Sequence, residues 1–164
     1  SLAESPAGVY MYARVWWDDL DGSCAGNSTR GLALSTDNGE TFGDPINAEG
    51  SDGDVNAFPG NPGTDTQGAI LYSEGGSAGT FLVGSPWGID HFPRQNYTVL
   101  ASTADADGKV TDWAPLPGAD PLFAGASEYS TLLQPTQDPG TFFVCYERGG
   151  TGDAVLHLTQ LRLP

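Results

Sequence analysis

The sequence predicts an all-β protein, and three observations lead to this fold class. The 164 residues include 23 glycines and 12 prolines, which interrupt the chain with turns more often than helices allow. Apolar residues make up 38% of the chain and aromatic residues 10%, which is enough for a hydrophobic core and too much for a disordered chain. No segment of adequate length repeats its apolar residues with a helical period. We therefore expect one domain of short strands separated by turns.

Eight segments have the pattern of a strand, with turn residues between them. The first, residues 8–17 (GVYMYARVWW), alternates two sets of side chains on opposite faces. The others are residues 31–37, 67–73, 80–87, 96–103, 129–134, 141–147 and 154–163. Their spacing predicts meanders, in which each strand pairs with the next.

An internal repeat bears on the architecture. Residues 35–42 (STDNGETF) read S-x-D-x-G-x-T-F, and a looser copy runs over residues 102–113, with Asp105, Gly108 and Thr111 inside it. The pattern predicts a tight hairpin, because the aspartate accepts bonds from turn amides, the glycine supplies a positive φ and the aromatic residue packs back on the sheet. An ordinary hairpin with an Asp-x-Gly turn is the alternative.

Both copies resemble the Asp-box, the hairpin signature of sialidase-type β-propeller blades. The resemblance implies a partial β-propeller, about two and a half to three four-stranded blades of a six-bladed ring. The blades are expected over residues 1–55, 65–117 and 125–164. Propellers need about four blades or more to close, so residues 1–164 would be the C-terminal half of a sialidase propeller domain. The other half would be a separate chain, a removed segment or an identical partner.

Six segments resemble the second half of exo-α-sialidases (neuraminidases), in the same order and over nearly the whole chain. YMYAR (10–14) and PRQNYTV (93–99) resemble the strands that carry the second and third arginines of the family. YSTL (129–132) resembles the strand with the nucleophilic tyrosine, and VCYE (144–147) the strand whose glutamate orients the first arginine. The other two are RGLALSTDNGETF (30–42), which contains the Asp-box, and TQGAI (66–70), which resembles a segment beside the polar groups of the substrate.

The resemblance implies that Arg14 and Arg94 bind the carboxylate of sialic acid, with Gln67 beside its polar groups. Arginine suits this task, because its planar guanidinium forms bidentate, charge-assisted hydrogen bonds that lysine cannot form. The alternative for each arginine is a surface ion pair at the end of a strand.

Tyr129 and Glu147 are the expected catalytic residues. Sialidases use a tyrosine nucleophile where most retaining glycosidases use a carboxylate. The alternative for Tyr129 is simple packing, and for Glu147 it is pairing with Arg148 or with solvent. Strand alternation sends Glu128 to the face opposite Tyr129, so it is not expected to act as the base.

Three family elements have no counterpart here: the first arginine, the aspartate acid/base and the glutamate that activates the tyrosine. Glu4 is a poor substitute for the last. We expect a part of a retaining exo-α-sialidase that removes terminal sialic acids from glycoconjugates and needs the N-terminal half of the propeller as its partner. The alternative is a non-catalytic sialoglycan-binding or structural Asp-box module.

Composition limits the other partners. The chain has 21 acidic against six basic residues and a net charge of −15, which argues against nucleic acid and anionic membranes. The acidity suits a secreted or extracellular protein, and no apolar run has membrane-spanning length. No cofactor is expected, and the spacing of Cys24 and Cys145 suggests no metal site. Cys145 is expected to be buried and unpaired.

Overall fold

The computed structural model describes residues 1–16, 28–43, 46–47, 68–75, 79–86, 94–107, 110–149 and 152–164. Within these residues the chain forms β-strands and no helix, which confirms the predicted all-β class. None of the described segments is a helix long and apolar enough to cross a membrane. The strands are β1 (Leu2–Ser5), β2 (Gly8–Trp16), β3 (Ser28–Ser35), β4 (Ile46–Asn47), β5 (Ala69–Ser73), β6 (Thr80–Pro86), β7 (Gln95–Ala104), β8 (Val110–Pro115), β9 (Phe123–Leu133), β10 (Thr141–Arg148) and β11 (Val155–Arg162).

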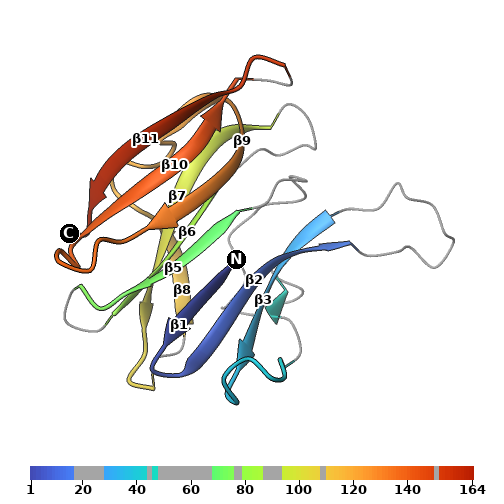
Figure 1. Cartoon of the computed structure of the whole chain (residues 1–164), viewed down its shortest axis with the longest axis vertical. Helices are drawn as coiled ribbons and strands as arrows, with labels where there is room; N and C mark the ends of the chain where they lie inside the picture. Colours follow the sequence, from blue (N-terminus) through green and yellow to red (C-terminus); the bar gives the residue numbers. More distant parts are fainter. Residues whose placement is uncertain are drawn as a thin grey trace, which may run out of the picture.

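The strands form three antiparallel groups that spread like a fan (Figure 1). The first sheet has the order β1-β2-β3-β4, the middle sheet runs from β5 to β8, and the third sheet contains β9, β10 and β11. Each strand pairs with the next within its group, as the meander prediction requires. The middle and third sheets are also joined, because the first residues of β9 pair with the start of β7 through Gln95–Ala126 and Tyr97–Phe123.

The middle sheet is buried on both faces. On β6, Phe81 and Val83 belong to a core cluster shared with the first sheet, whereas Leu82 belongs to a second cluster shared with the third sheet. A strand buried on both sides reads as a continuous apolar run, which is why residues 80–87 show little alternation.

Aromatic pairs connect the three sheets through these two clusters. Tyr10 of β2 meets Phe81 edge to face at 4.8 Å between ring centroids, and Tyr97 of β7 stacks on Tyr146 of β10 at 4.6 Å. Pairs of this kind contribute about 0.5–1.5 kcal/mol beyond the area that they bury. Burial raises the pKa of Tyr10, whose hydroxyl accepts a hydrogen bond from the Val110 backbone N–H at 3.1 Å.

The first Asp-box copy forms the predicted hairpin, directly after β3. The carboxylate of Asp37 accepts hydrogen bonds from the Ser35 hydroxyl (2.7 Å), the Thr41 backbone N–H (2.9 Å) and the Thr41 hydroxyl (2.5 Å). These bonds, the Thr41 hydroxyl first, lower the pKa of Asp37 from 3.8 to about 2. The turn needs positive φ at Asn38 (60°) and Gly39 (88°), where glycine and asparagine are tolerated best.

The looser copy lies at the equivalent place in the middle sheet, between β7 and β8. Ser102 pairs directly with the buried Trp113, and the carboxylate of Asp105 accepts a hydrogen bond from the Asp107 backbone N–H at 2.9 Å. Gly108 and the Thr111 side chain lie outside the described part of the copy. Both copies therefore connect the third and fourth strands of their sheets.

The outer face of the third sheet exposes large apolar side chains. Leu133, Leu156 and Leu158 are 64%, 70% and 68% exposed, and Leu2 of the first sheet is 62% exposed. Cys145 is a free thiol on β10, as predicted, but it is partly exposed and not fully buried. Cys24 lies outside the described residues.

Candidate functional site

β5 contacts both β1 and β9, so these three inner strands lie side by side. The start of β1 and part of β9 both lie at the start of β5, as two hydrogen bonds show. At this end the Ser1 hydroxyl accepts a hydrogen bond from the Ile70 backbone N–H (3.2 Å). The Ser130 hydroxyl donates to the carbonyl of Gly84 (3.4 Å), and Gly84 pairs with Ala69 at the start of β5. We call this side of the molecule the strand-start end.

All the predicted site residues on described backbone lie at the strand-start end. Arg14 is near the end of β2, opposite Arg30 and beyond the residues of β2 that pair with β1. Arg94 directly precedes β7, and its carbonyl accepts a hydrogen bond from Ser127 at 2.9 Å. Glu147 is near the end of β10, and Tyr129 is within β9. The side chain of Arg14 and the whole of Gln67 lie outside the described residues.

Tyr129 and Glu147 meet at an irregularity between β9 and β10. The ladder pairs Tyr146 with Ser130 and Arg148 with Ser127, so β9 has one residue more than β10 between these pairs. An extra residue leaves part of the backbone outside the ladder. Here the carboxylate Oε2 of Glu147 accepts a hydrogen bond from the Tyr129 backbone N–H at 3.4 Å. Tyr129 is 47% exposed, so its side chain reaches solvent instead of the core.

Glu128 is the second carboxylate of this bulge, and it contacts Arg94. Its Oε2 lies 3.5 Å from Nη1 of Arg94, and the two side chains are only 16% and 15% exposed. Burial of this degree makes the ion pair stronger than a fully exposed one, because less water screens the two charges. That Glu128 does not act as the base for Tyr129 stays a prediction, and its carboxylate is paired with Arg94. The contact links Arg94 to the residue next to Tyr129.

Arg148 does not pair with Glu147, which corrects one alternative drawn from the sequence. Its Nε and Nη2 donate to the Tyr146 hydroxyl at 3.1 and 2.7 Å. Its guanidinium carbon lies 4.2 Å from the centroid of the Phe123 ring, within the range of a cation–π contact. This arginine therefore braces the junction of β9 and β10 from the side of the core.

Sequence reasoning missed two residues of this end, Glu128 and Ser127. Ser127 is fully buried, and its hydroxyl has no hydrogen-bond partner among the described residues. Glu128 lies within the bulge and Ser127 at its edge, and no residue pattern in the sequence predicts a bulge. His157 lies beside Tyr146, with 6.2 Å between the ring centroids. Among the described residues, no group of three or more His, Cys, Asp or Glu could hold a metal ion.

Comparison with known proteins gives a structural likeness without a sequence family. No family model matches the chain, and no curated protein matches it. A similar solved structure is an α-L-arabinofuranosidase from Fusarium graminearum in complex with an iminosugar inhibitor, with a TM-score of 0.59 and 14% identity. The match covers 99% of this chain and 41% of the other, so this chain spans less than half of its neighbour. The likeness confirms a partial β-propeller fold.

Proposed function

We propose that the chain is part of a propeller glycoside hydrolase, and specifically of a retaining exo-α-sialidase. The observation that carries the proposal is the β9 bulge, where a half-exposed Tyr129 lies beside Glu147 and is linked through Glu128 to Arg94. Bulges are frequent beside active sites, because they re-aim side chains. The arabinofuranosidase neighbour supports only the coarser idea of a glycosidase.

In this proposal Tyr129 attacks the anomeric carbon as the glycosidic bond breaks, and the acid of the other half protonates the departing oxygen. Water then hydrolyses the tyrosyl–sugar intermediate with net retention and frees the tyrosine. A neutral phenol approaches an anionic sugar without the repulsion that a carboxylate would meet. A phenol has an ordinary pKa near 10, so it needs a base. That base, the aspartate acid/base and the first arginine would come from the other half of the ring.

The substrate carboxylate would be bound by Arg14 and Arg94, with Gln67 at the polar groups of the sugar. The ion pair with Glu128 supports this role for Arg94, since a guanidinium held at the strand-start end is already oriented for a ligand. Glu147, now bonded to the Tyr129 backbone, would orient the arginine that the other half supplies.

The partner of this chain would be the rest of the propeller. Exposed leucines on the outer face of β9–β11 support this. The two core clusters lie between the first and middle sheets and between the middle and third sheets, whereas no described residue of another sheet packs on this outer face. An uncovered apolar patch is a common mark of an interface. Terminal sialic acids on glycoconjugates would be the substrates.

The test uses the complete polypeptide ring and its hydrolysis of a sialoside. Tyr129→Phe is expected to remove most of kcat, by about 100-fold or more, because the nucleophile is lost while the arginines still bind the carboxylate. Thr36→Ala, an exposed residue in the Asp-box turn away from the strand-start end and from the outer face of β9–β11, is the control and should keep full activity. Unchanged turnover in Tyr129→Phe would refute the role.

A non-catalytic sialoglycan-binding module is the second candidate. It needs the propeller fold and a carboxylate-binding Arg94, but no nucleophile at Tyr129. A complete ring that binds a sialic acid analogue through Arg94 but hydrolyses no sialoside would identify this second function.

A further inference from the structure

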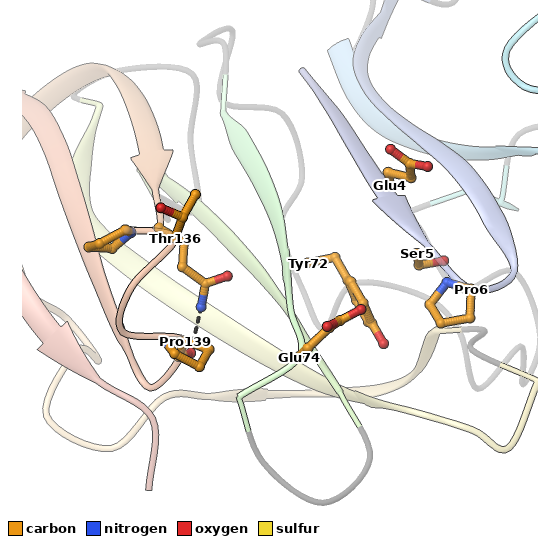
Figure 2. Close-up of a pocket in the computed structure, with 9 residues that line it drawn as sticks. Glu4, Ser5, Pro6, Tyr72, Glu74, Thr136 and Pro139 are labelled. Carbon is orange, nitrogen blue, oxygen red and sulfur yellow. Dashed lines mark hydrogen bonds between the residues drawn. The ribbon is translucent and has the colours of Figure 1, made fainter.

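A pocket lies at the end of the inner strands opposite the strand-start end, where β1, β5 and β9 finish. It has a volume of about 570 Å³ and is lined from three connections that are far apart in the sequence. Figure 2 shows Glu4 and Ser5 at the end of β1 on one side, together with Pro6 of the turn that follows. Tyr72 and Glu74 lie in the middle, and Thr136 and Pro139 of the β9–β10 connection lie on the other side. A volume of this size is within the range of about 300–1,000 Å³ that small-molecule sites occupy.

Hydrogen bonds of Ser73 join the middle of this pocket to the wall formed by the β9–β10 connection. The Ser73 hydroxyl donates to the carbonyl of Pro139 (2.8 Å) and accepts from the Gln134 side-chain amide (2.6 Å) and the Gly75 backbone N–H (3.0 Å). The packing is close enough that a Cβ at Gly75 would lie 2.1 Å from the Pro139 carbonyl oxygen. Since this wall is built before any ligand arrives, binding would cost little ordering entropy.

The polar groups of the pocket have unused hydrogen-bonding capacity. The side chains of Glu4, Glu74 and Thr136 make no hydrogen bond or ion pair with another described residue. The ring of Tyr72 packs against Phe81 with 4.8 Å between centroids. Burial and the nearby charge of Glu74 raise the pKa of the Tyr72 hydroxyl, so this group stays a donor at neutral pH.

The apolar part of the lining consists of four ring side chains. Pro6, Pro135 and Pro139 add apolar pyrrolidine surface to the one aromatic ring, Tyr72. An aromatic face suits the C–H face of a pyranose, and carboxylates and hydroxyls suit its O–H groups. None of the described residues that line the pocket is cationic, so the two glutamates would repel an anionic sugar.

We propose that this pocket binds a neutral sugar unit, separately from the strand-start end. Its hydroxyl groups donate to Glu4 and Glu74, and its apolar face lies on Tyr72 and the proline rings. The proposal is independent of the sialidase proposal, because the pocket shares no residue with the strand-start end. It also predicts a neutral sugar, whereas the sialidase proposal predicts an anionic one.

The experiment is an amide NMR titration of this 164-residue chain with lactose and galactose. Spermidine, glucosamine and N-acetylneuraminic acid are titrated in parallel. Lactose is expected to shift the amides of Ser5, Glu74 and Thr136, with a Kd of about millimolar magnitude. Glu74→Gln and Tyr72→Phe each keep the shape of the wall and should weaken lactose binding several-fold, up to about tenfold, because the first replaces a charged acceptor with a neutral one and the second removes a hydroxyl.

Thr131→Val, on the outer face of β9, is the control and should bind lactose as the parent chain does. Three results would overturn the proposal: no shift with either neutral sugar, shifts confined to the strand-start end, or binding of spermidine and glucosamine without lactose. The last would identify the pocket as a cation site. Failure of the pocket proposal would leave the role of Tyr129 standing, because that role is tested by Tyr129→Phe in the complete ring, so the two proposals fail separately.

Discussion

The carboxylate of Glu147 caps the bulge that carries Tyr129, with 3.4 Å between Oε2 and the Tyr129 backbone nitrogen. A backbone N–H left outside the ladder needs an acceptor, and a carboxylate is a strong one. A residue expected for its catalytic role therefore also stabilises the backbone of the candidate nucleophile. Loss of Glu147 would disturb both.

Removal of this cap should be visible at one amide. Glu147→Ala is expected to speed hydrogen exchange of the Tyr129 amide and to lower the free energy of unfolding by about 0.5–1.5 kcal/mol. Glu147→Gln keeps an acceptor oxygen and should fall between the parent and the alanine variant. Amide exchange by NMR measures this, with Glu74→Gln, a carboxylate at the opposite end of the inner strands, as the control. An unchanged Tyr129 amide in Glu147→Ala would show that the contact is not formed in solution.

The Asp-box carboxylate of Asp37 should titrate well below the ordinary range of an aspartate. The folded-state pKa of Asp37, about 2, lies below its ordinary value of 3.8, so its contribution to stability is complete above about pH 4 and is lost as the pH falls toward 2. Thr41→Val removes the hydroxyl that lowers this pKa most and should move it toward 3.8, whereas Thr41→Ser should keep it low. Carboxyl carbon NMR gives both values. Equal midpoints in the two variants would contradict the assignment.

The Asp-box and most strands could be predicted because their signals are local. Residues 35–42 contain every group that their hairpin uses, and strands such as β10 and β11 show their apolar pattern directly. The sequence did not reveal β1, β4, β8 or the first residues of β9 as strands. β1 and β4 are short, and the start of β9 is a strand only because β7 lies beside it.

Substitution of Gly84, which lies at the strand-start end, should lower stability. A Cβ at this position would lie 2.2 Å from the Tyr97 hydroxyl, and stacking on Tyr146 limits how far that ring can move. Gly84→Ala is therefore expected to lower the free energy of unfolding by about 1–3 kcal/mol. At Gly140 the nearest atom to a new Cβ is 3.7 Å away, so Gly140→Ala should stay within about 0.5 kcal/mol of the parent. Denaturant unfolding compares them, and equal losses would contradict the packing.

The apolar outer face of the third sheet should respond to charge without loss of stability. Leu156→Lys combined with Leu158→Lys is expected to reduce binding of a hydrophobic dye, while the free energy of unfolding changes by about 0.5 kcal/mol or less. Gln160→Lys adds charge to the same strand without removing an apolar side chain, so it should leave dye binding unchanged. A large loss of stability in the double variant would mean that these leucines are packed within the chain.

The candidate site was harder to predict than the fold, for a physical reason. A motif can indicate that Tyr129 and Glu147 are functional residues, but the bulge that joins them depends on the register between β9 and β10. The same bulge holds Glu128, whose contact with Arg94 no motif contains. Register is a property of strand pairs, and a single strand carries little information about it.

The central claim, that Tyr129 is the nucleophile of a retaining sialidase, is tested most directly by trapping the intermediate. The complete ring is quenched in acid during turnover of a slow sialoside, digested, and its peptides are measured by mass spectrometry. We expect a sialyl group on the peptide that contains Tyr129, and none in Tyr129→Phe. A sialyl group on a carboxylate, or turnover with no labelled peptide, would contradict the claim.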